Sequence, residues 1–498
     1  MSKTKSPEEL SYSRPLDVHT WSDYPEVNSF VNQIYSEHFA DPLSEIRKKH
    51  LKVILLDLYV AWSDDPKLCT AVHMNDRKYK AKTRYNSIHI SKTIINVVKI
   101  LTNLGLVYFH PGFYDRRKGG VSRVSRIWPS ETLTLHFRKA HFSILEIDYH
   151  EERECIVLRD EAKKDIEYED TPETVRMRNI LSAYNRLLRR THIDCSHLDK
   201  AYILKKNGSR VHISQNRNFI RRIFNNSSWT QGGRFYGGWW QQISGDNRSG
   251  IRINGKRTIE IDYSGIHIVL LYARLGINYF DEHGYNDDPY EIRLPAINDP
   301  ELTRWLAKNT FLMALNAINE DAAFGAVQKV ARESGSIPNG ESLTTSFLKE
   351  ILDQLKDKHP KISTWLCSGA GIALQYTDSQ ITEKIIEYFT SIDVPVLCVH
   401  DSYVIDEDYA DALHEQMLLA WDHEANLDDT HRDFLERFSP QETKVKQLGY
   451  TDELLFDDPK EHEEITKMKD LEYVSPRYIK SLKEFRNWRE KKKELVMI

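Results

Sequence analysis

The sequence predicts an α+β protein with more than one domain. Its 498 residues exceed the length of one average domain. Apolar residues recur at helical spacing in Ser44–Trp62 and again after Ser91. Short runs rich in β-branched residues, such as Val394–Val399, are bounded by turn signals and indicate strands. Helices and antiparallel strands are therefore both expected.

The composition, 40% hydrophobic and 29% charged, is typical of a soluble globular protein. No apolar run approaches the roughly 18 residues that span a bilayer. Met1–Pro15 is polar and lacks the apolar centre of an export signal. We therefore expect a cytoplasmic protein without membrane contacts. The cysteines are few, scattered and without a CxxC pair, so we expect them to be reduced and structural: Cys69, Cys155, Cys195, Cys367 and Cys398.

The net charge of −5 hides two strongly basic segments. Residues 76–126 contain twelve Lys or Arg against two acids, and residues 203–257 contain eleven against one. A chain that is acidic overall but has two basic segments suggests that a polyanion binds at defined surfaces. Ordinary solvated charged faces are the alternative.

The pattern divides the chain into five parts. They are a leader (1–40), an N-terminal domain (41–140), a charged connector followed by a helix (141–200), a catalytic domain (201–430) and a charged tail (431–498). The connector is poor in large apolar groups, and its helix is expected to start at Thr171-Pro172, with threonine as the cap. The tail is expected to form surface helices or partly disordered chain.

The N-terminal domain combines helices with a basic hairpin. Gly105 is expected to end a helix in the left-handed conformation, and strands are expected at Leu106–Phe109 and Val121–Trp128. This order resembles the winged-helix DNA-binding domains of replication initiators and bacterial regulators. The resemblance implies that the helix enters the major groove and the hairpin meets the DNA backbone or minor groove. A winged helix used only for protein contacts is the alternative. The basic residues of the hairpin are Arg116, Arg117, Lys118, Arg123 and Arg126.

Two aspartates that end apolar strands are the strongest candidates for chemistry. Asp262 follows the strand Thr258–Ile261 and precedes an apolar helix. Asp401 lies at the tip of a hairpin between Val394–Val399 and Tyr403–Ile405. If these strands are neighbours, the two carboxylates converge. Convergent carboxylates suit a pair of divalent metal ions, because Mg²⁺ prefers few carboxylates together with water and phosphate oxygens.

Four blocks in this order resemble the palm and fingers of the single-subunit polymerases, the superfamily of family A DNA polymerases and phage-type RNA polymerases. The resemblance implies that residues 201–430 form a right-hand polymerase core with an antiparallel palm sheet and helical fingers. The blocks are Gly233-Arg234-Phe235-Tyr236, Asp262-Tyr263-Ser264-Gly265-Ile266, Arg304 with Lys308, and His400-Asp401-Ser402.

The resemblance also implies the catalytic roles. Asp262 and Asp401 would hold two Mg²⁺ ions, with Mn²⁺ as an alternative, and the backbone carbonyl of Tyr263 would complete the shell of the second ion. Arg304 and Lys308 lie one turn apart on a helix expected to start at Asp299-Pro300, so both can reach a triphosphate. Lys308 would protonate the leaving pyrophosphate.

Other residues are expected to contact nucleotide, primer or template. A buried, satisfied amide is the alternative for Gln375, and a role in shaping the hairpin is the alternative for His400. Arg221 and Arg222 lie among aromatic residues and are expected to contact nucleic-acid phosphates. The nucleotide or primer contacts implied by the resemblance are Arg234, Tyr236, Tyr263, Gly265, His267, Asn316, Gln375, His400 and Ser402.

The sequence therefore predicts a template-directed nucleotidyltransferase that extends RNA or DNA on a DNA template from nucleoside triphosphates. Ser402, the Gly-Arg-Phe-Tyr block, and His267 in place of the glutamate of DNA polymerases favour RNA slightly over DNA. One rival is a DNA-binding replication initiator or regulator with an inactive polymerase-like core. A metal-dependent nuclease also uses paired carboxylates, but it gives no reason for the pair Arg304 and Lys308.

Overall fold

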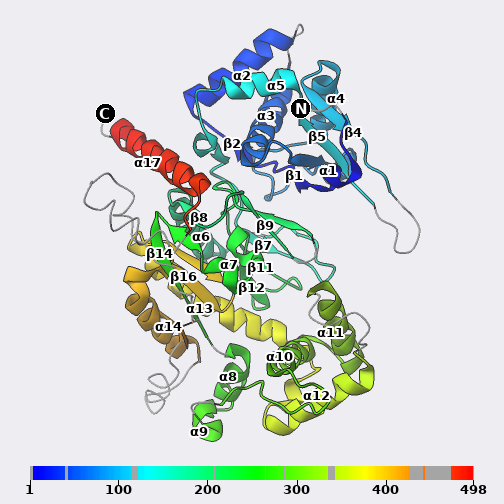
Figure 1. Cartoon of the computed structure of the whole chain (residues 1–498), viewed down its shortest axis with the longest axis vertical. Helices are drawn as coiled ribbons and strands as arrows, with labels where there is room; N and C mark the ends of the chain where they lie inside the picture. Colours follow the sequence, from blue (N-terminus) through cyan, green and yellow to red (C-terminus); the bar gives the residue numbers. More distant parts are fainter. Residues whose placement is uncertain are drawn as a thin grey trace.

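The computed structural model (Figure 1) describes residues 4–39, 43–114, 122–205, 208–263, 265–284, 287–334, 343–425, 441–442 and 473–496. As the sequence predicts, the chain is a mixed α and β protein. It has two large buried clusters of apolar side chains, one formed by residues between Val27 and Ile147, the other by residues between Cys155 and Trp421. Within the described ranges, no helix has the length and apolar character needed to cross a membrane.

Helix α3 (Glu45–Asp64) is the centre of the N-terminal cluster. Its residues from His50 to Ala61 are all buried, which identifies it as a core helix surrounded on every side. The surrounding helices are α2 (Pro25–His38), α4 (Thr93–Asn103) and α5 (Glu131–Arg138). A four-stranded sheet of order β1-β3-β5-β4 completes this part, with strands Ser13–Pro15, Cys69–Val72, Ser125–Pro129 and Val107–His110.

The predicted helix and hairpin of this part are present. Gly105 has φ +69° just after the C-cap of α4, and the helix begins one residue later than a Ser91 cap would place it. Strands β4 and β5 pair antiparallel, with Phe109 opposite Ile127. Arg116, Arg117 and Lys118 lie outside the described residues.

The expectation of a separate leader over residues 1–40 is wrong. Helix α1 (Pro7–Ser11) is followed by strand β1, which pairs in parallel with β3. Helix α2 buries Val27, Phe30 and Ile34 in the N-terminal core. These three residues form an apolar stripe at helical spacing, and such a stripe gains free energy by packing against another element.

The charged connector also contributes to the core. Its strand β7 (Ile156–Leu158) is fully buried and pairs in parallel with β11 (Arg221–Phe224), which pairs antiparallel with β12 (Gly232–Tyr236). Three consecutive apolar residues are enough for an interior strand even within an acidic stretch. Helix α6 (Pro172–Arg189) then starts as predicted, capped by the Thr171 hydroxyl.

The main sheet has the order β15-β16-β14-β13-β8. Helices α13 (Gly371–Ser391) and α14 (Ala410–Ala425) contact it. Strand β17 (Gln441–Glu442) pairs with the end of β14. In this order, the first five strands of the six-stranded sheet are Val396–Val399, Ser402–Asp406, Lys256–Asp262, Ile251–Ile253 and Ile193–Cys195.

Three helices pack against one another at the end of the molecule farthest from the N-terminal part (Figure 1). They are α10 (Pro300–Asn316), α11 (Glu320–Ser334) and α12 (Thr345–Lys358). Helix α10 begins as predicted, because the Asp299 carboxylate accepts hydrogen bonds from the Glu301 and Leu302 N–H groups. Helices α8 (Ile266–Ala273) and α9 (Tyr279–His283) connect the sheet to this group.

Part of the charged tail forms a surface helix, as expected, and this helix is docked through one apolar face. Helix α17 (Pro476–Val496) buries Tyr478, Leu482 and Trp488. The Arg477 guanidinium makes two hydrogen bonds to the Asp194 carboxylate on β8, at 2.7 and 2.9 Å. Residues 443–472 lie outside the described part of the chain. All five cysteines are free, as expected.

Candidate active site

The pairing of β14 with β16 brings the two aspartates together. The strands are antiparallel neighbours, with Asp262 directly opposite Ser402, so Asp401 lies beside the end of β14. The Tyr263 N–H donates a hydrogen bond to the Asp401 carbonyl at 3.2 Å. The side chain of Tyr263 is buried, and its hydroxyl donates to the Met417 carbonyl, so only its backbone faces the pair.

The two carboxylates repel each other at this position. Burial and then the charge of Asp401 raise the pKa of Asp262 to about 8, against the opposing charge of Lys308. A neighbouring charged acid disfavours ionisation of the buried Asp262, and a bound cation would relieve this repulsion. The negative charge concentrated at this site would therefore favour a bound cation.

Glu260 supports the pair but is not available as a third ligand. It lies two residues before Asp262 on the same face of β14. Arg248 donates to both of its oxygens, at 2.7 and 2.8 Å, and the buried Ser402 hydroxyl donates at 2.7 Å. The nucleotide contact expected for Ser402 is therefore wrong, because its hydroxyl is used inside the sheet. Strand periodicity already places Glu260 on the same face as Asp262, although no motif marks it in the sequence.

A second layer lies behind the aspartates. The Arg234 guanidinium pairs with the buried Asp378 of α13 at 2.7 Å, and its Nη2 lies 3.0 Å from His267 Nε2. Burial and the positive charge of Arg234 lower the pKa of His267 to about 4, so this imidazole is neutral. Burial lowers the pKa of Arg234, but Asp378 and Asp401 outweigh it and keep the guanidinium charged. Asp378 was not identified from the sequence, where it is one acid in a long helix.

The turn residue His400 has a left-handed backbone, with φ +58°. Histidine is one of the residues that tolerates this conformation more readily than most. Its ring lies edge-on to Tyr236, with ring centres 5.7 Å apart, and its buried Nδ1 has no hydrogen-bond partner within the described structure. His400 and Tyr236 thus form one wall beside Asp401.

The two cations predicted on helix α10, Arg304 and Lys308, have different surroundings. The charge of Lys308 acts on Asp262, lowering its pKa against the effects of burial and Asp401. Arg304 is instead paired with Asp288 at 2.5 Å. The buried ring of Tyr290 lies near both cations, 5.6 Å from the Arg304 guanidinium and 6.0 Å from the Lys308 ammonium. Neither Asp288 nor Tyr290 was identified from the sequence, because both lie in a loop without a motif.

Three further predicted residues are placed around this centre. Gly265 has φ +67° at the start of α8, and an added Cβ would lie 3.0 Å from Pro289 Cγ. Gln375 lies within α13, and its amide donates to the Asn316 side chain at 3.1 Å. This hydrogen bond joins the end of α10 to α13.

The predicted phosphate contact of Arg222 is wrong. Only 1% of its surface is exposed, and its guanidinium is paired with Glu383 and donates to the Gly233 carbonyl at 2.9 Å. Strand alternation turns Arg222 inward, where a buried charge requires a partner. Arg221, its neighbour, is half-buried.

The hairpin arginines are also partly engaged. Arg126 donates to the Leu10 and Val124 carbonyls, at 2.9 and 2.6 Å, so it fastens α1 to the sheet instead of facing solvent freely. Arg123 is half-buried, with its guanidinium 5.3 Å from the Phe113 ring.

Comparison of the chain with models of known families, with curated proteins and with solved structures gives no match. Its function has to be inferred from the arrangement of its own residues.

Proposed function

We propose that the chain is a template-directed nucleotidyltransferase, which extends RNA or DNA on a DNA template from nucleoside triphosphates. One observation carries the proposal. Asp262 and Asp401 are adjacent at the ends of neighbouring antiparallel strands, and the positive charge of Lys308 on α10 acts on Asp262. Phosphoryl transfer needs positioning and charge neutralisation around a triphosphate more than covalent help. Two acids and a cation on a separate helix meet this requirement.

The residues present fit divalent metal ions. Asp262 and Asp401 would hold Mg²⁺, with Mn²⁺ as an alternative, together with the Tyr263 carbonyl. The raised pKa of Asp262 supports this, because the repulsion between the two carboxylates is what bound cations offset. When bound, such ions polarise phosphate oxygens and lower the pKa of an attacking hydroxyl.

The protein side chains have separate roles in this proposal. Lys308 gives a proton to the leaving pyrophosphate, and Arg304 binds the triphosphate after releasing Asp288. Tyr236 and His400 border the end of the growing strand. Burial, and then the charge of Arg234, keep His267 neutral. As a histidine, this position offers no carboxylate of the kind that DNA polymerases use to exclude ribonucleotides. This supports the slight preference for RNA over DNA.

The N-terminal part is proposed to bind the DNA as a winged helix. Helix α4 followed by the antiparallel hairpin β4–β5 supports this proposal. Arg123 borders the hairpin, whereas Arg126 has a structural role. The rival function is an initiator with an inactive core. The adjacent acids beside Lys308 favour the enzyme, because a core that only clamps nucleic acid gains nothing from this repulsion.

The test is extension of primed and unprimed single-stranded DNA by the full chain with Mg²⁺, with ribonucleotides and deoxyribonucleotides in separate reactions. The proposal expects template-dependent product that Asp262→Asn and Asp401→Asn abolish while DNA binding persists. Asp393→Asn is the matched control, since Asp393 is exposed in the turn before β15 and pairs only with Arg190 among the described residues.

Undiminished product in both site variants would refute the mechanism. Bound DNA without product from the wild-type protein would favour the initiator. Shortening of the labelled template instead of extension would favour the nuclease.

A further inference from the structure

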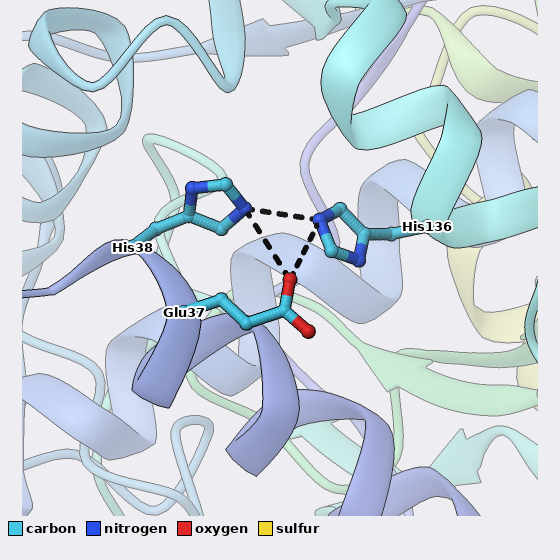
Figure 2. A group of neighbouring side chains, drawn as sticks. All are labelled: Glu37, His38 and His136. Atoms are coloured by element: carbon cyan, nitrogen blue, oxygen red, sulfur yellow. Dashed lines mark hydrogen bonds and ion pairs between the residues drawn. The ribbon is translucent and has the colours of Figure 1, made fainter.

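Two histidines and a glutamate meet in the N-terminal part, where the C-terminal ends of α2 and α5 come together (Figure 2). Glu37 and His38 are the last two residues of α2, and His136 lies in the last turn of α5. The His38 and His136 Nε2 atoms are 2.9 Å apart. The Glu37 Oε2 lies 3.6 Å from His136 Nε2 and 4.0 Å from His38 Nε2. Three potential ligand atoms therefore form one small triangle.

The size of this triangle suits a tetrahedral metal ion. With ligand distances of about 2.0–2.2 Å, the donor atoms of a tetrahedral Zn²⁺ site are separated by roughly 3.3 Å. The three distances in the cluster, 2.9, 3.6 and 4.0 Å, bracket this separation. Small side-chain rotations would equalise them, and solvent can supply a fourth ligand because the Glu37 side chain is 45% exposed.

A neighbouring side chain orients one of the donors. The Gln33 amide donates to the Glu37 Oε1 at 2.7 Å, which orients the carboxylate. Outer contacts of this kind orient the ligands of known metal sites. The ends of two helices add partial negative charge, which favours a cation.

We propose that Glu37, His38 and His136 bind a Zn²⁺ ion that joins α2 to α5. Two imidazole nitrogens with one carboxylate oxygen select zinc over magnesium, because Mg²⁺ prefers oxygen ligands alone. The site is distinct from the aspartate pair and needs no triphosphate. Its effect is structural, because it fastens α2, which lies far from α5 along the chain, to the N-terminal core.

The test is equilibrium dialysis of the metal-stripped full chain against Zn²⁺, with excess Mg²⁺ present to occupy the aspartate pair. Bound Co²⁺ gives a second readout, since four-coordinate Co²⁺ absorbs strongly in the visible range. We expect one Zn²⁺ per chain for the wild-type protein and for the control His141→Ala, whose imidazole is exposed in the same region. His38→Ala and His136→Ala should lose this binding. Gln33→Ala should weaken it by about tenfold.

Glu37→Gln keeps the size of an exposed side chain and so tests the site even if a histidine variant fails to fold. It should also weaken zinc binding by at least about tenfold. Absence of zinc binding by the wild-type protein would refute the proposal and leave a direct hydrogen bond between the imidazoles. Undiminished binding in His136→Ala and Glu37→Gln together would place the zinc elsewhere and equally refute it.

Discussion

The repulsion between Asp262 and Asp401 predicts a stability change for Asp262→Asn. The ordinary pKa of an aspartate is 3.8, and in the folded chain burial and Asp401 raise the pKa of Asp262 to about 8. The folded state thus keeps a proton that the unfolded state releases. Stability from this group is complete below pH 3.8 and is lost as the pH rises toward 8. Since one pKa unit corresponds to about 1.4 kcal/mol, the loss is on the order of 5 kcal/mol.

Asparagine has nearly the same shape but does not ionise. In metal-free buffer, Asp262→Asn and the wild-type protein should therefore be similarly stable near pH 4, and the variant should be more stable near pH 8 by several kcal/mol. Urea unfolding at intervals across this pH range measures the difference. Asp393→Asn should follow the wild-type curve, because Asp393 lies exposed on the surface.

Mg²⁺ should reduce the difference in unfolding free energy between the two proteins near pH 8, because it stabilises the wild-type protein. A ligand at a hundred times its dissociation constant stabilises a protein by about 2.7 kcal/mol. This gain should appear in the wild-type protein and shrink in Asp262→Asn. A difference between the two proteins that does not change with pH would refute the proposed repulsion. Equal stabilisation of both by Mg²⁺ would refute the metal site.

Three further predictions follow from single residues. Lys308→Gln should slow extension by about a hundredfold or more without weakening DNA binding, as expected for loss of a general acid. Lys329→Gln, on the exposed side of α11, is the control. Equal extension rates in the two variants would contradict the proposed role of Lys308 as general acid. Arg222→Leu should lower the unfolding free energy by about 3–5 kcal/mol, because Glu383 loses its buried partner. A loss of DNA affinity without a loss of stability would instead support the phosphate contact that the sequence predicts for Arg222. Gly265→Ala should lower the free energy of unfolding, measured by thermal unfolding, by about 1–2 kcal/mol. The loss should be smaller for Gly276→Ala, because Gly276 has a similar φ of +68° but no heavy atom within 4 Å of an added Cβ. Equal losses would mean that Pro289 moves aside at no cost.

Local signals predicted much of the fold. Thr171 and Asp299 cap their helices as expected, and the strand pattern before Asp262 is correct. The predictions that failed concern elements whose place depends on residues far away in the sequence. Strand β7 is short and lies in an acidic stretch, and only its pairing with β11 makes it a core strand.

The same distinction holds for the candidate site. The residues that the resemblance singled out, Asp262, Asp401 and Lys308, are brought together, because each lies at a recognisable place on a strand or helix. Asp378 and Tyr290 gain meaning only from contacts with Arg234 and the α10 cations. The sequence alone suggests that Arg222 is a surface cation, because the buried ion pair with Glu383 is not apparent without the structure.

The register of β14 and β16 has a consequence for mutational robustness. On the face opposite the acids, Ile261 is paired with Tyr403, and both are buried. A slip of one residue would exchange the faces, so that Ile261 would take the place of Asp262. The position of the acid pair is thus encoded in part by apolar side chains on the opposite face of the sheet. A polar substitution at Ile261 should therefore disturb the alignment of Asp262 with Asp401, although Ile261 belongs to neither the acid pair nor its surroundings on that face.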